Sequence, residues 1–137
     1  MAFPQSLAGR QVSPVRRGRG ALIGLWTVQV VLVGMFLLAG GSKLAGAQEM
    51  VALFDAIGVG QWFRYVTGFI EVASAVALLS PALAPFGAVA LVLTMIGAVG
   101  IHLFVVGGSP AVPAVLLFGS AAVAWARRDQ LRAALPR

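Results

Sequence analysis

Long apolar runs without charge constrain this sequence more than any other feature. The first, residues 21–41, contains no charged residue, and its length of about twenty residues is what a helix needs to cross ~30 Å of hydrocarbon. Three further runs follow at residues 62–80, 86–106 and 111–126. Charged residues make up 10% of the chain, far below the ~25% typical of soluble domains. The sequence therefore predicts an all-α fold, a four-transmembrane-helix bundle forming one membrane domain over residues 21–128.

The segment between the first two runs, residues 42–60, predicts a short interfacial helix. It is too short and too charged to cross the membrane. Its apolar residues recur at steps of three and four, which places them on one face of a helix; they are Met50, Leu53, Phe54 and Ile57. Gly58 and Gly60 are expected to stop this helix, which we expect to lie over the mouth of the bundle.

The distribution of arginine predicts the orientation. Residues 1–20 form a basic arm with four arginines, expected to be disordered, and four more lie at the end of the last run and in the tail, residues 129–137. The opposite loops hold only Lys43 and Arg64. Because cytoplasmic segments carry the excess of positive charge, we expect a multi-pass protein of the bacterial inner membrane with both termini cytoplasmic. The arginines flank spans, which favours contact with the lipid bilayer and not with nucleic acid.

The first run allows a second interpretation, a cleaved signal peptide, because Ala45-Gly46-Ala47 resembles a cleavage site. Apolar regions of signal peptides are usually ~7–15 residues long. This run is longer and is followed by further spans, so a retained transmembrane helix is favoured.

Glu71 is an acid in the middle of the second run. At ~1.5 Å per residue it lies close to the membrane midplane, where a charge costs ~2.5–3.5 kcal/mol or more and usually finds a partner inside the protein. Gln29 comes out at a similar depth on the first helix, which predicts a central polar layer with one group from each helix. The supporting members of this layer are Thr67, Ser74, Thr94 and Ser120. On the second helix, residues at steps of three or four form one stripe that is expected to face the bundle axis; they are Arg64, Thr67, Glu71, Ser74 and Leu78.

Three basic side chains on the outer side of the membrane could form a rim above Glu71. Lys43 is expected just past the first span, Arg64 near the start of the second and His102 inside the end of the third. With Glu71 and Gln29 they are the predicted ligand-binding residues.

Each of these residues also has a structural interpretation. Lys43 and Arg64 would then be interfacial anchors, and His102 would donate to a backbone carbonyl. Glu71 would be protonated and hydrogen-bonded to Gln29 or Thr67.

The chain has no cysteine and one histidine. It therefore offers no thiol chemistry or thiolate metal site and no pair of histidines for haem within one chain. We predict no metal site, no covalent cofactor and no enzyme activity of the chain on its own.

Several short motifs together resemble the DoxX and DoxX-like family of small membrane proteins, over about residues 22–128. These motifs are Gly40-Gly41-Ser42-Lys43-Leu44, Gly68-Phe69-Ile70-Glu71, Met95-Ile96-Gly97-Ala98 and His102-Leu103, with Leu25-Trp26-Thr27-Val28-Gln29-Val30 in the first helix. The resemblance implies a four-helix bundle and an association with respiratory or redox complexes. By the matched motifs it points to Lys43, Glu71 and His102 as the site.

The leading hypothesis is an accessory protein of a membrane redox system that binds a quinone-like lipophilic molecule at the polar centre. An apolar ring with two polar oxygens suits such a site. The alternatives are a non-catalytic assembly or stability factor for a larger complex and a small proton-coupled transporter. The expected partners are the lipid bilayer and either subunits of a redox complex or further copies of the chain.

Overall fold

The computed structural model describes residues 18–136, and within that range it consists of helices joined by short loops, without a strand. This confirms the predicted all-α class. The helices are α1 (Arg19–Ala45), α2 (Gln48–Ile57), α3 (Gln61–Ala77), α4 (Ala84–Ile101), α5 (Ala111–Ala126) and α6 (Arg128–Ala134), and α4 continues into a π-helical segment, η1 (His102–Val106). The predicted arm at residues 1–20 lies outside the described residues except for its last three.

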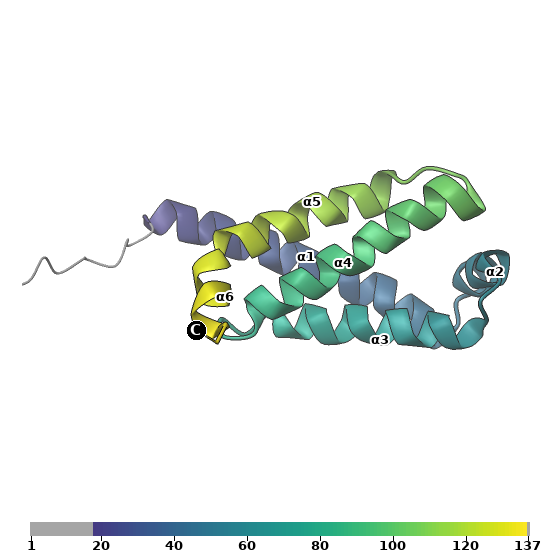
Figure 1. Ribbon diagram of the computed structural model, residues 1–137, viewed down its shortest axis with the longest axis horizontal. Helices are drawn as coiled ribbons and strands as arrows, with labels where there is room; N and C mark the ends of the chain where they lie inside the picture. The colour runs from purple at the N-terminus through teal and green to yellow at the C-terminus, as the bar shows by residue number, and fades with distance from the viewer. Residues whose placement is uncertain (1–17, 137) are drawn as a thin grey trace, which may run out of the picture.

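The longer helices α1, α3, α4 and α5 lie side by side, each antiparallel to the next along the chain (Figure 1). The main contacts pair α1 with α3, α3 with α4, and α4 with α5. The short helix α2 lies at one end of the molecule, whereas α6 and the start of α1 lie at the other (Figure 1).

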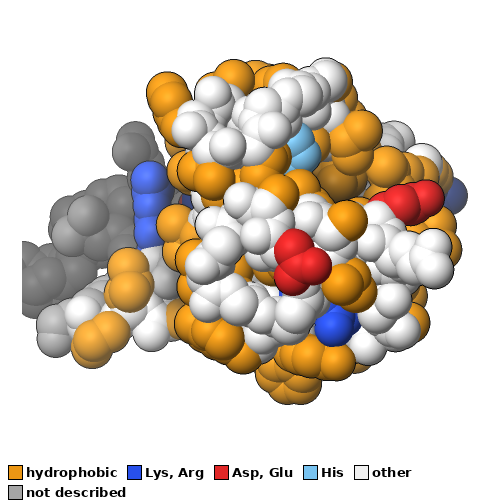
Figure 2. Space-filling view, turned by 90° about the vertical axis from the view of Figure 1, so that its right-hand side faces the viewer, with side chains coloured by type: hydrophobic (Ala, Val, Ile, Leu, Met, Phe, Trp, Pro, Cys, Tyr) orange, Lys and Arg blue, Asp and Glu red, His pale blue; other side chains and the backbone are white. Residues whose placement is uncertain are grey.

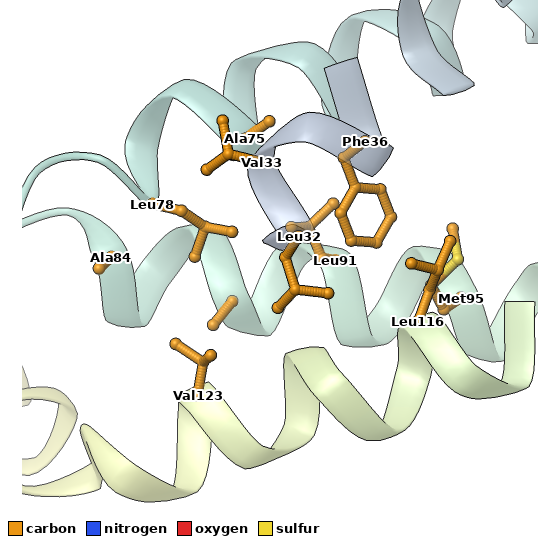
Figure 3. Packing of buried hydrophobic residues seen from close by; sticks show 11 residues of the cluster. Leu32, Val33, Phe36, Ala75, Leu78, Ala84, Leu91, Met95, Leu116 and Val123 are labelled. Carbon is orange, nitrogen blue, oxygen red and sulfur yellow. The ribbon is translucent and has the colours of Figure 1, made fainter. Parts of the chain in front are cut away.

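The core lies between these helices and is built from large aliphatic and aromatic side chains (Figure 3). Phe36 of α1, Leu78 beyond the end of α3, Leu91 of α4 and Val123 of α5 are at most 1% exposed. Burying such a side chain contributes ~1.5–3 kcal/mol in an aqueous reference state. The core therefore holds the four longer helices together.

The outer surface is also apolar, with large side chains such as Phe104, Phe118 and Trp125 strongly exposed. Two helical segments, Arg19–Ala45 and Ala84–Val106, are long and apolar enough to cross a membrane, and α5 is a shorter apolar helix. Only 22% and 11% of the apolar windows of the two long segments are buried, which is unlike the core helix of a soluble protein. Helices of this kind are those of a membrane protein.

The end of α1 differs from the predicted run, whereas the end of α2 agrees with the prediction. The helix α1 continues to Ala45, so Lys43 lies in its last turn and not beyond its end; Gly46, in the left-handed conformation, ends the helix there. The helix α2 lies within the segment predicted to form a short helix and ends at Gly58, which is also left-handed.

Candidate functional site

A cavity of about 620 Å³ opens between the longer helices at the end where α2 lies. This volume is within the range of ~300–1,000 Å³ found for ligand pockets. Figure 2 looks at this end, where the surface is made mainly of apolar side chains together with backbone and uncharged groups, and charged side chains are few. The lining consists of Ala39, Lys43, Met50, Leu53, Phe54, Ile57, Phe63, Thr67, Ile70, Glu71, Leu93, Thr94, Met95, Gly97, Ala98, Ile101, His102, Ser109, Val112, Pro113 and Leu116.

The helix α2 covers the cavity with the apolar face that its sequence predicts. All four residues of that face, Met50, Leu53, Phe54 and Ile57, line the cavity. The ring of Phe54 also packs edge-on against Phe63 of α3, with ring centroids 5.7 Å apart. The expected position over the mouth of the longer helices is thus observed.

An ion pair between α1 and α3 forms part of the cavity wall. Lys43 Nζ lies 3.0 Å from Glu71 Oε2, and the two side chains are 14% and 2% exposed. Glu71 therefore has a cationic partner, which is what an acid in an apolar segment needs. This differs from the alternative in which Glu71 is hydrogen-bonded to Gln29 or Thr67.

Two glycines bring the helices close enough for this pair to form. A Cβ atom added to Gly40 would lie 2.9 Å from the carbonyl oxygen of Gly68, and one added to Gly68 would lie 2.9 Å from Lys43 Cβ. Only residues without a side chain allow this approach. Because α1 and α3 are antiparallel, each charged residue lies beside the glycine of the other helix. A Cβ atom at Gly40 would lie 3.0 Å from Glu71 Cβ, and the one at Gly68 lies against Lys43, so the crossing brings the two side chains together.

Arg64 lies behind the ion pair and caps α1. Its guanidinium Nη1 donates to the backbone carbonyl of Lys43, and its Nε donates to Gln61 Oε1 at 2.6 Å. Gln61 Nε2 in turn donates to Val51 O and Asp55 Oδ1 of α2, at 3.0 and 2.7 Å. A cation at a helix C-terminus is favourable, so Arg64 stabilises the last turn of α1. Arg64 does not line the cavity, contrary to its prediction as a ligand-binding residue. Sequence reasoning missed Gln61 and Asp55.

His102 lines the same cavity as Lys43 and Glu71. Its Nδ1 lies 2.8 Å from the carbonyl oxygen of Ala98, and a carbonyl can only accept, so Nδ1 carries a proton. The structural interpretation of His102, donation to a carbonyl, is therefore observed together with its position in the cavity wall. The residue is also the first of η1, and π-helical turns occur often at functional sites.

Two of the predicted supporting residues, Thr67 and Thr94, also line the cavity. The Thr94 hydroxyl donates to Ala90 O at 2.8 Å, and the Thr67 hydroxyl donates to Phe63 O at 3.0 Å or Arg64 O at 3.1 Å. Their oxygens keep the capacity to accept a hydrogen bond.

Gln29 does not join this cluster, so the single polar layer predicted from helix depth is not formed. Its Nε2 donates to Leu78 O at 2.8 Å, and its Oε1 accepts from Arg127 Nε at 2.9 Å. Arg127 also donates to Gln130 Oε1, and Gln130 Nε2 donates to Pro81 O. Depth counted from the end of the apolar run placed Gln29 level with Glu71. In the structure Gln29 lies level with Leu78, and Glu71 lies against Gly40, eleven residues further along α1. Arg127 was interpreted from the sequence only as a charge that sets the orientation. This second polar cluster joins helix ends opposite α2 (Figure 1).

Ser74 and Ser120 are buried and do not line the cavity. Within residues 18–136, the hydroxyl of Ser120 has no hydrogen-bond partner. In the same range, no three His, Asp or Glu side chains lie close enough together to hold a metal ion.

The apolar helices and the ligand-sized cavity with a charged pair in its wall define a membrane protein with a potential binding site. Residues 27–134 match the sequence profile of the DoxX-like family. The chain belongs to this family, as the motifs predicted. No curated protein and no solved structure matches it.

Proposed function

We propose that this protein binds a quinone-like lipophilic molecule in the cavity beneath α2, as an accessory component of a membrane redox system. The observation that carries this proposal is the cavity itself: about 620 Å³, mostly apolar, with Lys43, Glu71 and His102 together in its wall. Ligand sites commonly combine an apolar lining with a few convergent polar groups. The apolar surface suits a ring and tail, and the polar group suits the oxygens of the head.

The proposal includes a four-helix transmembrane bundle in the bacterial inner membrane. The least apolar of the longer helices, α3, has 17 residues and spans about 26 Å at ~1.5 Å per residue. Glu71 of α3 is paired with Lys43, and this pairing lowers the free-energy cost of placing a charged side chain within the membrane. The arginines near both termini support a cytoplasmic location of the end opposite α2.

The proposed role is binding and positioning of the ligand. The chain has no cysteine and one histidine, so we assign the electron-transfer centre to a partner subunit of the redox system.

Two matched glycines of α4 provide the test. A Cβ atom at either Gly97 or Gly100 would meet no atom within 4 Å, but only Gly97 lines the cavity. In a quinone titration of the purified protein in detergent, Gly97→Leu should weaken binding about tenfold or more and Gly100→Leu should not. Glu71→Gln and His102→Ala should also weaken it. Equal affinity in the wild type and all of these variants would contradict the proposed site.

A further inference from the structure

The hydrogen-bonding groups around the cavity are mostly acceptors. His102 Nδ1 uses its proton on the carbonyl of Ala98, so in the neutral imidazole Nε2 presents a lone pair. No partner for Nε2 lies within the described part of the chain. A ligand that meets this nitrogen must therefore supply the hydrogen.

The two threonines in the cavity wall have the same character. Both hydroxyl hydrogens are used on carbonyls of their own helices. Thr67 and Thr94 can thus offer only oxygen lone pairs to a molecule in the cavity.

Glu71 adds a further acceptor. Its Oε2 accepts from Lys43 Nζ at 3.0 Å, and between residues 18 and 136 its Oε1 accepts no hydrogen bond. The donors in the lining are the Lys43 ammonium, which uses one of its three hydrogens on Glu71, and the exposed hydroxyl of Ser109. Acceptors outnumber donors around the buried part of the cavity.

A hydroxyl group and a carbonyl group differ in how they satisfy this lining. A hydroxyl donates one hydrogen bond and can also accept one, so it can serve His102 or Glu71 and receive a bond from Lys43. A quinone carbonyl can only accept: it can also receive a bond from Lys43, but it leaves His102 Nε2 and Glu71 Oε1 without a donor. Leaving a buried polar group unpaired is unfavourable.

We propose that the cavity selects a lipophilic ligand whose head carries hydroxyl hydrogens, so that a hydroquinone binds more tightly than the corresponding quinone. This inference rests on the proposed function and adds which redox form of the ligand is held. An accessory protein with this preference retains the reduced form and releases the oxidised one.

Three probes with one ring and one tail separate hydrogen-bond donation from other differences. They are a decyl-substituted para-benzoquinone, its hydroquinone kept reduced without oxygen, and the dimethyl ether of that hydroquinone, which has the oxygens but no donor. Calorimetric titration of the full chain in detergent should give about tenfold tighter binding of the hydroquinone than of either other probe, the effect of one unpaired polar group.

Matched variants locate the effect. Thr94→Val removes an acceptor from the cavity wall. Thr27→Val is the control: the Thr27 hydroxyl donates to Ile23 O of its own helix in the same way, but Thr27 does not line the cavity. The hydroquinone preference should fall in Thr94→Val and in His102→Phe and persist in Thr27→Val. Because either cavity variant suffices, a folding defect in one leaves the test intact.

The outcomes distinguish this inference from the proposed function. If the quinone binds as tightly as the hydroquinone or more tightly, the proposed preference for hydroxyl donors is wrong, although the site still binds quinones. The same holds if the hydroquinone preference is unchanged in both Thr94→Val and His102→Phe. Binding of none of the three probes overturns both.

Discussion

The close crossing of α1 and α3 at Gly40 is the feature on which the candidate site depends most. A Cβ atom at Gly40 would lie 2.8 Å from Val72 Cγ2, 2.9 Å from Gly68 O and 3.0 Å from Glu71 Cβ. Carbon atoms in contact prefer ~3.5–4.0 Å. The backbone oxygen of Gly68 cannot move unless α3 moves, so Gly40→Ala should push the helices apart by several tenths of an ångström or more.

The neighbouring glycine provides the control for this variant. A Cβ atom at Gly41 would meet nothing within 4 Å. Alanine is favoured over glycine inside a helix by ~0.5–1 kcal/mol, and this gain is common to both variants. The difference in unfolding free energy between Gly40→Ala and Gly41→Ala therefore isolates the overpacking cost, which should be ~1–3 kcal/mol.

Denaturant unfolding of both variants in the same detergent micelles, followed by circular dichroism, measures this difference. Gly41→Ala should be at least as stable as the wild type, and Gly40→Ala should be less stable. If Gly40→Ala were as stable as Gly41→Ala, the helices would not cross at this residue, and the explanation given for the Lys43–Glu71 pair would be refuted.

Three further predictions concern buried polar groups, each measured by the same unfolding assay. Lys43→Met should cost ~3–5 kcal/mol because it leaves Glu71 buried without its cation, and adding Glu71→Leu should restore most of the loss; failure of the double variant to recover would contradict the pairing. Ser120→Ala should be neutral or stabilising by up to ~1 kcal/mol, because its hydroxyl has no partner among the described residues; a clear loss would reveal a bonded water. Gln29→Leu should cost ~1–3 kcal/mol through two lost hydrogen bonds, and an unchanged protein would refute the second polar cluster.

The sequence predicted the elements of this fold because they follow from local periodicity. Apolar runs gave the longer helices, and the spacing from Met50 to Ile57 gave both the existence of α2 and the face it turns to the cavity. The stripe on α3 was also correctly placed, since Arg64, Glu71 and Ser74 are buried on it. The number of membrane spans stays a prediction, because two segments have the length and hydropathy to cross and α5 is shorter.

The sequence did not show which polar groups meet, because that depends on how far each helix is shifted along its neighbours as well as on how it is rotated. Gln29 and Glu71 were predicted at similar depths, but Gln29 lies level with Leu78 at the end of α3. Glu71 lies against Gly40, eleven residues or about 16 Å further along α1. One signal could have indicated the ion pair: Gly40 precedes Lys43, and Gly68 precedes Glu71, by the same three residues. Paired small residues allow close helix crossings in membranes. In an antiparallel crossing, the residue three beyond each glycine can lie beside the glycine of the other helix, which brings the two charges close.

The Lys43–Glu71 pair is a costly means of joining α1 to α3 if joining is its only role. Replacing a buried ion pair by apolar side chains of similar size is often neutral or stabilising. The approach at Gly40 and Gly68 already packs the two helices together. What the pair adds is a charged group within the cavity wall, where a ligand head would lie. The Lys43→Met, Glu71→Leu double variant therefore separates the two roles: a protein that stays folded but no longer binds quinone or hydroquinone would show that the pair serves the site.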